Sequence, residues 1–360
     1  MPIKLVLIVC AGALLVSGGC RSRQSESTIR VGSVLPLTGD IASYGVAAKR
    51  GVDLAVDELN RAGGVTGRRL EVLYEDDQGQ VNQAVAAMQK LVSVDRVAAV
   101  IGSAASSVTL ALCPIANREK VPLITPISSS EELTSKGGPY FFRVCPSDVL
   151  QAQMMADWFK EDGRRKAAIL YVNNSWGQSL RQEFEAKFRA SGGEIVAAEA
   201  VREGDRDMRA QLTKIKAAAP DALYAITHGK EGGVILLQAR ELALAKPIYG
   251  ADVWGSPELM ETARDAAKGV RIIVPTKFEG PKYSGFAAVF SKKYGAEPDV
   301  YAAYSYDLTY ALAAALAKSP SGDGLREALA GTSYEGVTGL TKFDEHGDVI
   351  GKGFQRKVLP

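Results

Sequence analysis

The chain has 360 residues, of which 46% are hydrophobic and 23% charged, and its net charge is +2. This length exceeds one typical hydrophobic core of roughly 100–150 residues, so we expect two lobes. The near-neutral charge, with no long basic patch containing interleaved aromatic residues, argues against nucleic acid as a partner.

The N-terminal residues are typical of an export signal. Met1–Lys4 is short and basic, Leu5–Val16 is apolar, and the small residues Ser17-Gly-Gly precede Cys20. The apolar run is shorter than the roughly 20 residues of a transmembrane helix, so we assign 1–19 to a signal peptide.

Cys20 resembles the lipidated cysteine of a bacterial lipobox, although Ser17 stands where leucine is usual. The resemblance implies a lipid on Cys20, a polar tether over 20–27, and an exported protein, periplasmic or at the cell surface, anchored to a membrane. Cleavage without lipidation is the alternative.

Strand and helix patterns alternate from Ile29 onward. The predicted strands span 29–35, 70–74, 97–101, 122–125, 167–172, 194–200, 222–226, 247–249 and 270–274. The predicted helices include 52–59, 82–92, 150–160, 178–190, 208–218, 233–242, 283–294 and 301–318. Strand-like pieces surround a turn at 345–348. Repeated units of this kind predict an α/β fold with parallel sheets flanked by helices.

Two of the predicted strands end in runs of small hydroxyl residues. One run follows Ile101 and contains Ser106, and the other follows Thr125 and contains Ser129. Ligands bind at the carboxyl ends of strands in open α/β sheets, and hydroxyl and backbone N–H groups suit a small anion such as a carboxylate. The pattern indicates capture of a small polar molecule. Helix capping is the alternative role for these serines.

Signs of catalysis or metal binding are absent from the sequence. It contains no Gly-x-Ser-x-Gly, Walker A or Gly-x-Gly-x-x-Gly motif, and only two histidines, His228 and His346. Asp76-Asp77 is read as a solvated strand end rather than an acid–base pair. We therefore expect neither an enzyme, nor a metal site, nor a cofactor.

The chain resembles type I periplasmic binding proteins of the leucine/isoleucine/valine-binding branch. The resemblance covers about 29–358 and rests on the order and spacing of Gly32-Ser-Val-Leu-Pro-Leu-Thr-Gly39, Gly45–Asn60 followed by Ala62-Gly-Gly-Val, Tyr74-Glu-Asp-Asp77, Ile101-Gly-Ser, Ile124-Thr-Pro126, Phe142-Arg143, Pro146-Ser-Asp148 and Phe343-Asp-Glu-His-Gly-Asp348. It implies two lobes, 28–147 plus 276–336 and 148–275 plus 337–360. Three crossings, near 145–147, Pro275 and Val337, would act as the hinge.

The resemblance also implies a set of ligand-binding residues. Ser106 and Ser129 would bind the carboxylate of the ligand, and Ser129 and the backbone carbonyl of Ile127 would also bind its amine. Asp252 would pair with that amine in its ammonium form. The family has a glutamate at this position, whose side chain is one methylene longer than that of Asp252. Tyr44, Trp176 and Tyr301 would form aromatic walls, and His228 lies near a position that is usually tyrosine.

The expected function is that of a substrate-binding lipoprotein, which delivers a branched-chain or apolar amino acid to an ABC permease. Two alternatives remain: a binding protein for another small acid or amide, and a sensory module. Cys113 and Cys145, the cysteines beyond the leader, form either a disulfide or two separate buried thiols.

Overall fold

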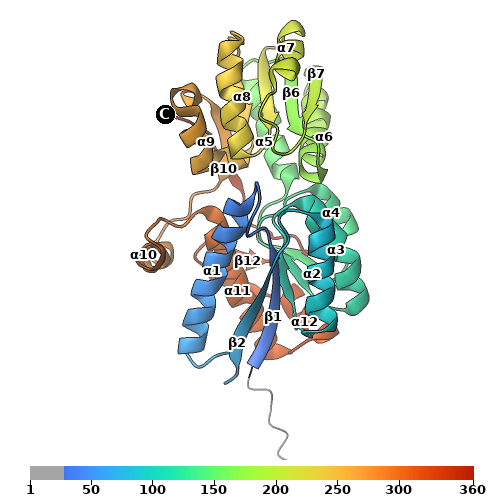
Figure 1. Cartoon of the computed structure of the whole chain (residues 1–360), viewed down its shortest axis with the longest axis vertical. Helices are drawn as coiled ribbons and strands as arrows, with labels where there is room; N and C mark the ends of the chain where they lie inside the picture. The colour runs from blue at the N-terminus through green and yellow to red at the C-terminus, as the bar shows by residue number, and fades with distance from the viewer. Residues whose placement is uncertain (1–27) are drawn as a thin grey trace, which may run out of the picture.

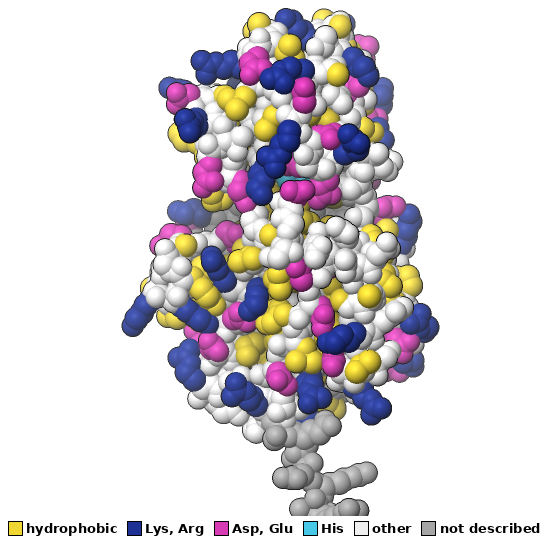
Figure 2. Space-filling model, in the orientation of Figure 1, with side chains coloured by type: hydrophobic (Ala, Val, Ile, Leu, Met, Phe, Trp, Pro, Cys, Tyr) yellow, Lys and Arg dark blue, Asp and Glu magenta, His cyan; other side chains and the backbone are white. Residues whose placement is uncertain are grey.

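The computed structural model, which describes residues 28–360, has two α/β lobes joined at a narrow waist (Figure 1 and Figure 2). Each lobe is built around its own sheet, and helices cover both faces. The fold class is therefore as predicted. The signal peptide, the tether and Cys20 lie outside the described residues.

Lobe one contains a five-stranded parallel sheet in the order β2-β1-β3-β4-β5. Its strands are β1 (Thr28–Leu35), β2 (Arg69–Asp76), β3 (Val100–Gly102), β4 (Leu123–Thr125) and β5 (Phe141–Arg143). Its helices are α1 (Ala42–Arg61), α2 (Val81–Ser93), α3 (Ser106–Glu119), α4 (Glu131–Lys136), α10 (Pro281–Tyr294), α11 (Val300–Lys318) and α12 (Gly322–Ala330). The hairpin β11 (Ser333–Gly336) and β12 (Gly339–Lys342) packs against α11.

Lobe two contains a six-stranded sheet in the order β13-β10-β9-β8-β6-β7, and only β13 is antiparallel. Its strands are β6 (Lys166–Val172), β7 (Glu194–Val201), β8 (Ala222–Ile226), β9 (Ile248–Gly250), β10 (Arg271–Pro275) and β13 (Phe354–Val358). Its helices are α5 (Asp148–Glu161), α6 (Ser175–Ala190), α7 (Arg209–Ala217), α8 (Gly229–Glu241), α9 (Pro257–Ala263) and the 3-10 turns η1 (Asp252–Gly255) and η2 (Arg264–Ala267). Every residue of β8 is buried, as expected for a central parallel strand.

The third connection between the lobes differs from the prediction, which placed it near Val337 and assigned 337–360 to lobe two. Phe343 belongs to the core of lobe one, and Asp307 of α11 accepts the backbone N–H groups of Val337 and Thr338. The chain joins the sheet of lobe two only at β13. The crossing therefore lies after Asp348, because a buried carboxylate from another segment holds the hairpin on lobe one.

Cys113 and Cys145 are separate buried thiols rather than a disulfide. They belong to two different hydrophobic clusters of lobe one, and their Sγ atoms donate to the carbonyls of Thr109 and Ser128, respectively. Burial raises the pKa of each thiol to about 12, so both are inert as nucleophiles.

Gly102 allows β3 to pass unusually close to β1. Its φ is +141°, and a Cβ atom at this position would lie 1.9 Å from the carbonyl oxygen of Val34. Only glycine fits such a contact, which shapes the loop between β3 and α3.

Candidate ligand-binding site

The two hydroxyl runs lie at the carboxyl ends of neighbouring strands. Ser106 is the first residue of α3, which follows β3, whereas Ile127 and Ser129 lie in the loop after β4. Ser106 Oγ accepts a hydrogen bond from the backbone N–H of Ser130 at 3.3 Å. This hydrogen bond holds the loop after β4, next to Ser129, against the start of α3.

Neither predicted serine caps a helix. Ala105 occupies the N-cap position of α3 and makes no side-chain cap, and Ser130 caps α4 by accepting the N–H of Glu132. The capping alternative for Ser106 and Ser129 is thus wrong.

Four rings from both lobes form an aromatic box, which we define as Tyr44, Trp176, His228 and Tyr301. The ring centroids of Trp176 and His228 are 5.2 Å apart and stacked at 21°. Tyr44 of lobe one lies 5.8 Å from His228 and 5.4 Å from Tyr301. Ile127 packs in the same cluster as Tyr44 and Tyr301. The structure therefore brings together residues of α1, α6 and α11 and the residue before α8, which are far apart in the sequence.

Asp252 occupies the lobe-two side of this box, at the start of η1. Its backbone N–H donates to Gln151 Oε1 at 2.8 Å, and Gln151 Nε2 donates to Asp252 Oδ1 at 3.2 Å. Burial raises the pKa of Asp252 to about 6, against the opposing effect of the Gln151 hydrogen bond. Asp252 is thus a positioned carboxylate that gains from a nearby cation.

Asp148 is a second buried carboxylate that the sequence analysis did not assign to the site. It is fully buried, Gln151 Nε2 also contacts its Oδ1 at 3.4 Å, and its Oδ2 has no hydrogen-bond partner within 28–360. Burial, followed by the nearby Asp252, raises the pKa of Asp148 to about 8, and the Ser129 and Trp176 side chains oppose this shift. Asp148 is the last residue of the family motif Pro146-Ser-Asp148. Only the fold shows that the side-chain amide of Gln151 lies between Asp148 and Asp252 and contacts both.

Arg143 holds the loop after β4, which contains Ser129 and Ser130, in place. Its guanidinium is fully buried, pairs with Asp348 at 2.6 Å, and donates to the carbonyls of Ser129 and Ser130 at 2.9 Å each. A charge-assisted network of this kind fixes the backbone that carries Ser129.

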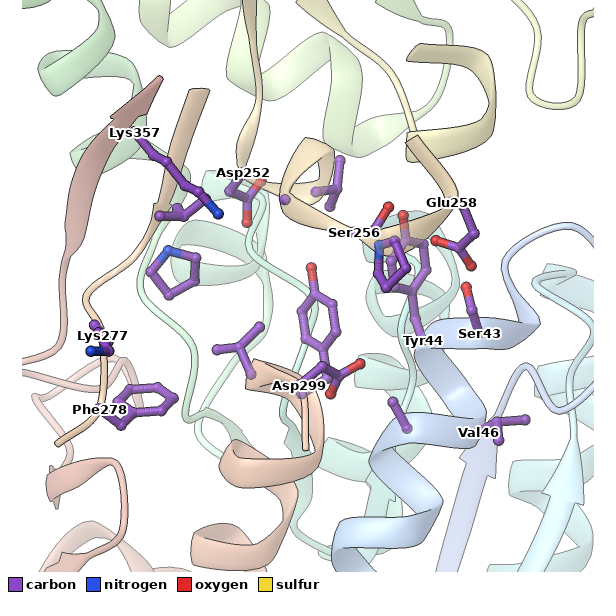
Figure 3. Close-up of a pocket in the computed structure, with 18 of the residues that line it drawn as sticks. Ser43, Tyr44, Val46, Asp252, Ser256, Glu258, Lys277, Phe278, Asp299 and Lys357 are labelled. Atoms are coloured by element: carbon purple, nitrogen blue, oxygen red, sulfur yellow. The ribbon is translucent and has the colours of Figure 1, made fainter. Parts of the chain in front are cut away.

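A cleft of about 650 Å³ adjoins the aromatic box. Tyr44 and Tyr301 line it from lobe one, and Asp252 lines it from lobe two. Figure 3 shows Asp252 at the upper side of the cleft, from lobe two, and Asp299 at the lower side, from lobe one. The lining does not include Ser106, Ser129, Trp176 or His228, since the four rings of the box already contact one another. The cleft thus meets the predicted site at three residues and extends away from the serines.

The part of the chain that the structure describes contains neither a cluster of metal ligands nor a helix that could span a membrane. No group of three or more histidine, cysteine, aspartate or glutamate side chains within 28–360 could hold a metal ion. None of the helices described is long and apolar enough to cross a membrane. Asp76 and Asp77 instead accept backbone N–H groups of adjoining turns, and Asp77 is buried rather than solvated.

The chain crosses between the lobes three times, and polar and aromatic groups of the two lobes lie on either side of the waist. This architecture is that of a hinged solute-binding protein. The chain belongs to the periplasmic binding protein family, whose model matches residues 28–356. Membership confirms the predicted resemblance and makes this a binding protein rather than an enzyme. It also indicates an exported protein.

Several relatives are similar over nearly the whole chain. The leucine-, isoleucine-, valine-, threonine- and alanine-binding protein of Pseudomonas aeruginosa is 29% identical over 341 residues, covering 94% of this chain and 91% of the relative. The leucine binding protein LivK of Thermotoga maritima superposes with a TM-score of 0.85 at 29% identity, covering 92% of this chain and 95% of that one. The branched-chain amino acid transporter substrate binding protein LivJ of Streptococcus pneumoniae, in complex with isoleucine, gives 0.82 at 30% identity, covering 92% and 100%.

Proposed function

We propose that this protein binds an α-amino acid between its lobes and delivers it to an ABC permease. The observation that carries the proposal is the opposed chemistry of the two walls. Lobe one offers the hydroxyl groups of Ser106 and Ser129, and lobe two offers the carboxylates of Asp252 and Asp148. A zwitterion with its carboxylate toward lobe one and its ammonium toward lobe two would place its carboxylate next to the serine hydroxyl groups and its ammonium next to the aspartate carboxylates.

Each group of the ligand has a proposed partner. Ser106 and Ser129 hydrogen-bond the carboxylate, the Ile127 carbonyl accepts from the ammonium, and Asp252 pairs with the ammonium, with Asp148 behind it. Charge-assisted hydrogen bonds in a site shielded from water are the stronger kind. Because the partners are divided between the lobes, the ligand favours the closed arrangement by contacting both.

The side chain of the ligand is proposed to enter the aromatic box formed by Tyr44, Trp176, His228 and Tyr301. On the names of the relatives alone, which include leucine and isoleucine, branched-chain amino acids are the first candidates. Delivery to a permease is supported by the relative named as a branched-chain amino acid transporter substrate binding protein.

Calorimetric titration tests the proposal. The protein is freed of ligand by unfolding and refolding and titrated with each of the twenty amino acids. We expect saturable binding of one group of amino acids, abolished by Asp252→Ala and by Ser129→Ala. A folded sample that binds none of the twenty would contradict the proposal.

Membrane anchoring through Cys20 is a separate part of the proposal, supported by the cysteine that follows small residues. Cell fractionation of Cys20→Ser and of the unchanged protein tests it. We expect the unchanged protein in the membrane fraction and the variant in the soluble exported fraction. Equal partition of the two would rule out a lipid on Cys20.

A further inference from the structure

His228 has unused hydrogen-bonding capacity inside the aromatic box. It immediately precedes α8, its side chain is 16% exposed, and Trp176 stacks on its ring. Neither Nδ1 nor Nε2 has a hydrogen-bond partner in the described residues. A buried donor without a hydrogen-bond acceptor is unfavourable, so a ligand that supplies an acceptor is favoured over one that does not.

An acceptor lies directly beside this donor. Glu203 Oε1 is 3.6 Å from His228 Nε2, which is an ion-pair distance rather than a hydrogen bond. Glu203 also approaches the start of α6, where Asn174 Nδ2 donates to Oε2 at 3.4 Å. A ring N–H donor and a carboxylate acceptor are therefore neighbours next to Trp176.

The charges around the ring favour its protonated form. Burial lowers the pKa of His228, but Glu203 and then Glu231 and Asp252 outweigh burial, so the net shift is upward. In the same way, His228 offsets the effect of burial on Glu203 and lowers the pKa of that carboxyl. An imidazolium donates from both nitrogens and accepts from neither.

We infer that His228 and Glu203 select an amino acid whose side chain ends in a carboxamide. The inference rests on the proposed function, in which the ligand side chain enters the aromatic box. A carboxamide carries an acceptor oxygen and a donor NH₂ next to one another, which matches the adjacent donor and acceptor of this pair. A leucine side chain offers neither, and a glutamate side chain would place a second carboxylate beside Glu203.

Competition between amino acids of similar size tests this inference. The refolded full-length protein is titrated separately with glutamine, leucine and glutamate. We expect glutamine to bind roughly tenfold to a hundredfold more tightly than leucine, since leucine brings no acceptor within hydrogen-bond distance of the buried ring N–H groups. Glutamate should bind more weakly than glutamine.

Variants assign the selectivity to the pair. His228→Phe keeps a ring to stack on Trp176 and should abolish or invert the preference for glutamine over leucine, whereas His228→Gln should retain part of it. Glu203→Gln should narrow the gap between glutamine and glutamate. His346→Phe is the matched control, because His346 is the other histidine of the chain and its side chain is 54% exposed.

The outcomes separate the inference from the proposed function. Tighter binding of leucine than of glutamine, with no change in His228→Phe, would overturn the inference and leave the amino-acid receptor intact. Tighter binding of glutamate than of glutamine would overturn the choice of a carboxamide. A folded protein that binds no amino acid at all would overturn both.

Discussion

Acidification should weaken amino-acid binding through Asp252. The ammonium of the ligand pairs with the ionised carboxylate, and protons compete for that carboxylate below its pKa of about 6. This carboxylate is almost fully ionised at pH 7 and about one-tenth ionised at pH 5, so affinity should fall about tenfold between these values. The sign follows from the raised pKa: the favourable interaction is present above pH 6 and lost as the pH decreases through it.

Calorimetric titration at several pH values between 5 and 7 measures this dependence, with the best-binding amino acid as ligand. Asp252→Asn should bind much more weakly and lose the dependence on pH. His228 is a further titratable group of the site, so His228→Gln serves as the matched control and should keep a decrease in affinity of similar size. An affinity that is constant from pH 5 to 7 in the unchanged protein would refute the assignment of Asp252 to the ammonium.

Two further predictions concern stability, and urea unfolding measures both. Arg143→Ala should lower the free energy of unfolding by about 3–5 kcal/mol, because it leaves the Asp348 carboxylate buried without its partner, whereas Lys277→Ala, at a site 74% exposed, should change it little. An equal effect of the two variants would show that the buried pair adds no stability. Gly102→Ala should cost more than ~2 kcal/mol, since its Cβ would overlap the Val34 carbonyl. Gly269→Ala, also at positive φ but with nothing within 4 Å, should cost about 1 kcal/mol, and a similar loss in both variants would contradict the steric argument.

Local patterns were sufficient to predict most of the fold. Apolar alternation and helical spacing are properties of neighbouring residues, so strands such as β6 and β8 were predicted within one residue of their observed ends. The helix α4 was missed because it spans only six residues, too few to show a clear period.

Long-range contacts explain what the sequence did not predict. The path of the chain after Val337 depends on Asp307, thirty residues earlier, and no local pattern shows that this carboxylate accepts both backbone N–H groups. Asp148 was missed for the same reason, because its role depends on a long-range contact: Gln151 connects it to Asp252, which lies far along the chain. The family resemblance supplied the eight candidate residues, of which Tyr44, Tyr301 and Asp252 line the cleft.

The carboxylates of Asp148 and Asp252 have a consequence for receptors that carry no ligand. The pKa of about 8 for Asp148 belongs to the structure in Figure 1, where the group is fully buried, and we expect a more open cleft to hydrate the carboxyl and return it toward ionisation. Closing an empty cleft at neutral pH is then coupled to proton uptake, whereas an amino acid brings its own positive charge. A permease that engages only closed receptors would hydrolyse little ATP on empty ones. The fraction of empty receptors that are closed would decrease further as the surrounding pH rises, because closure takes up a proton.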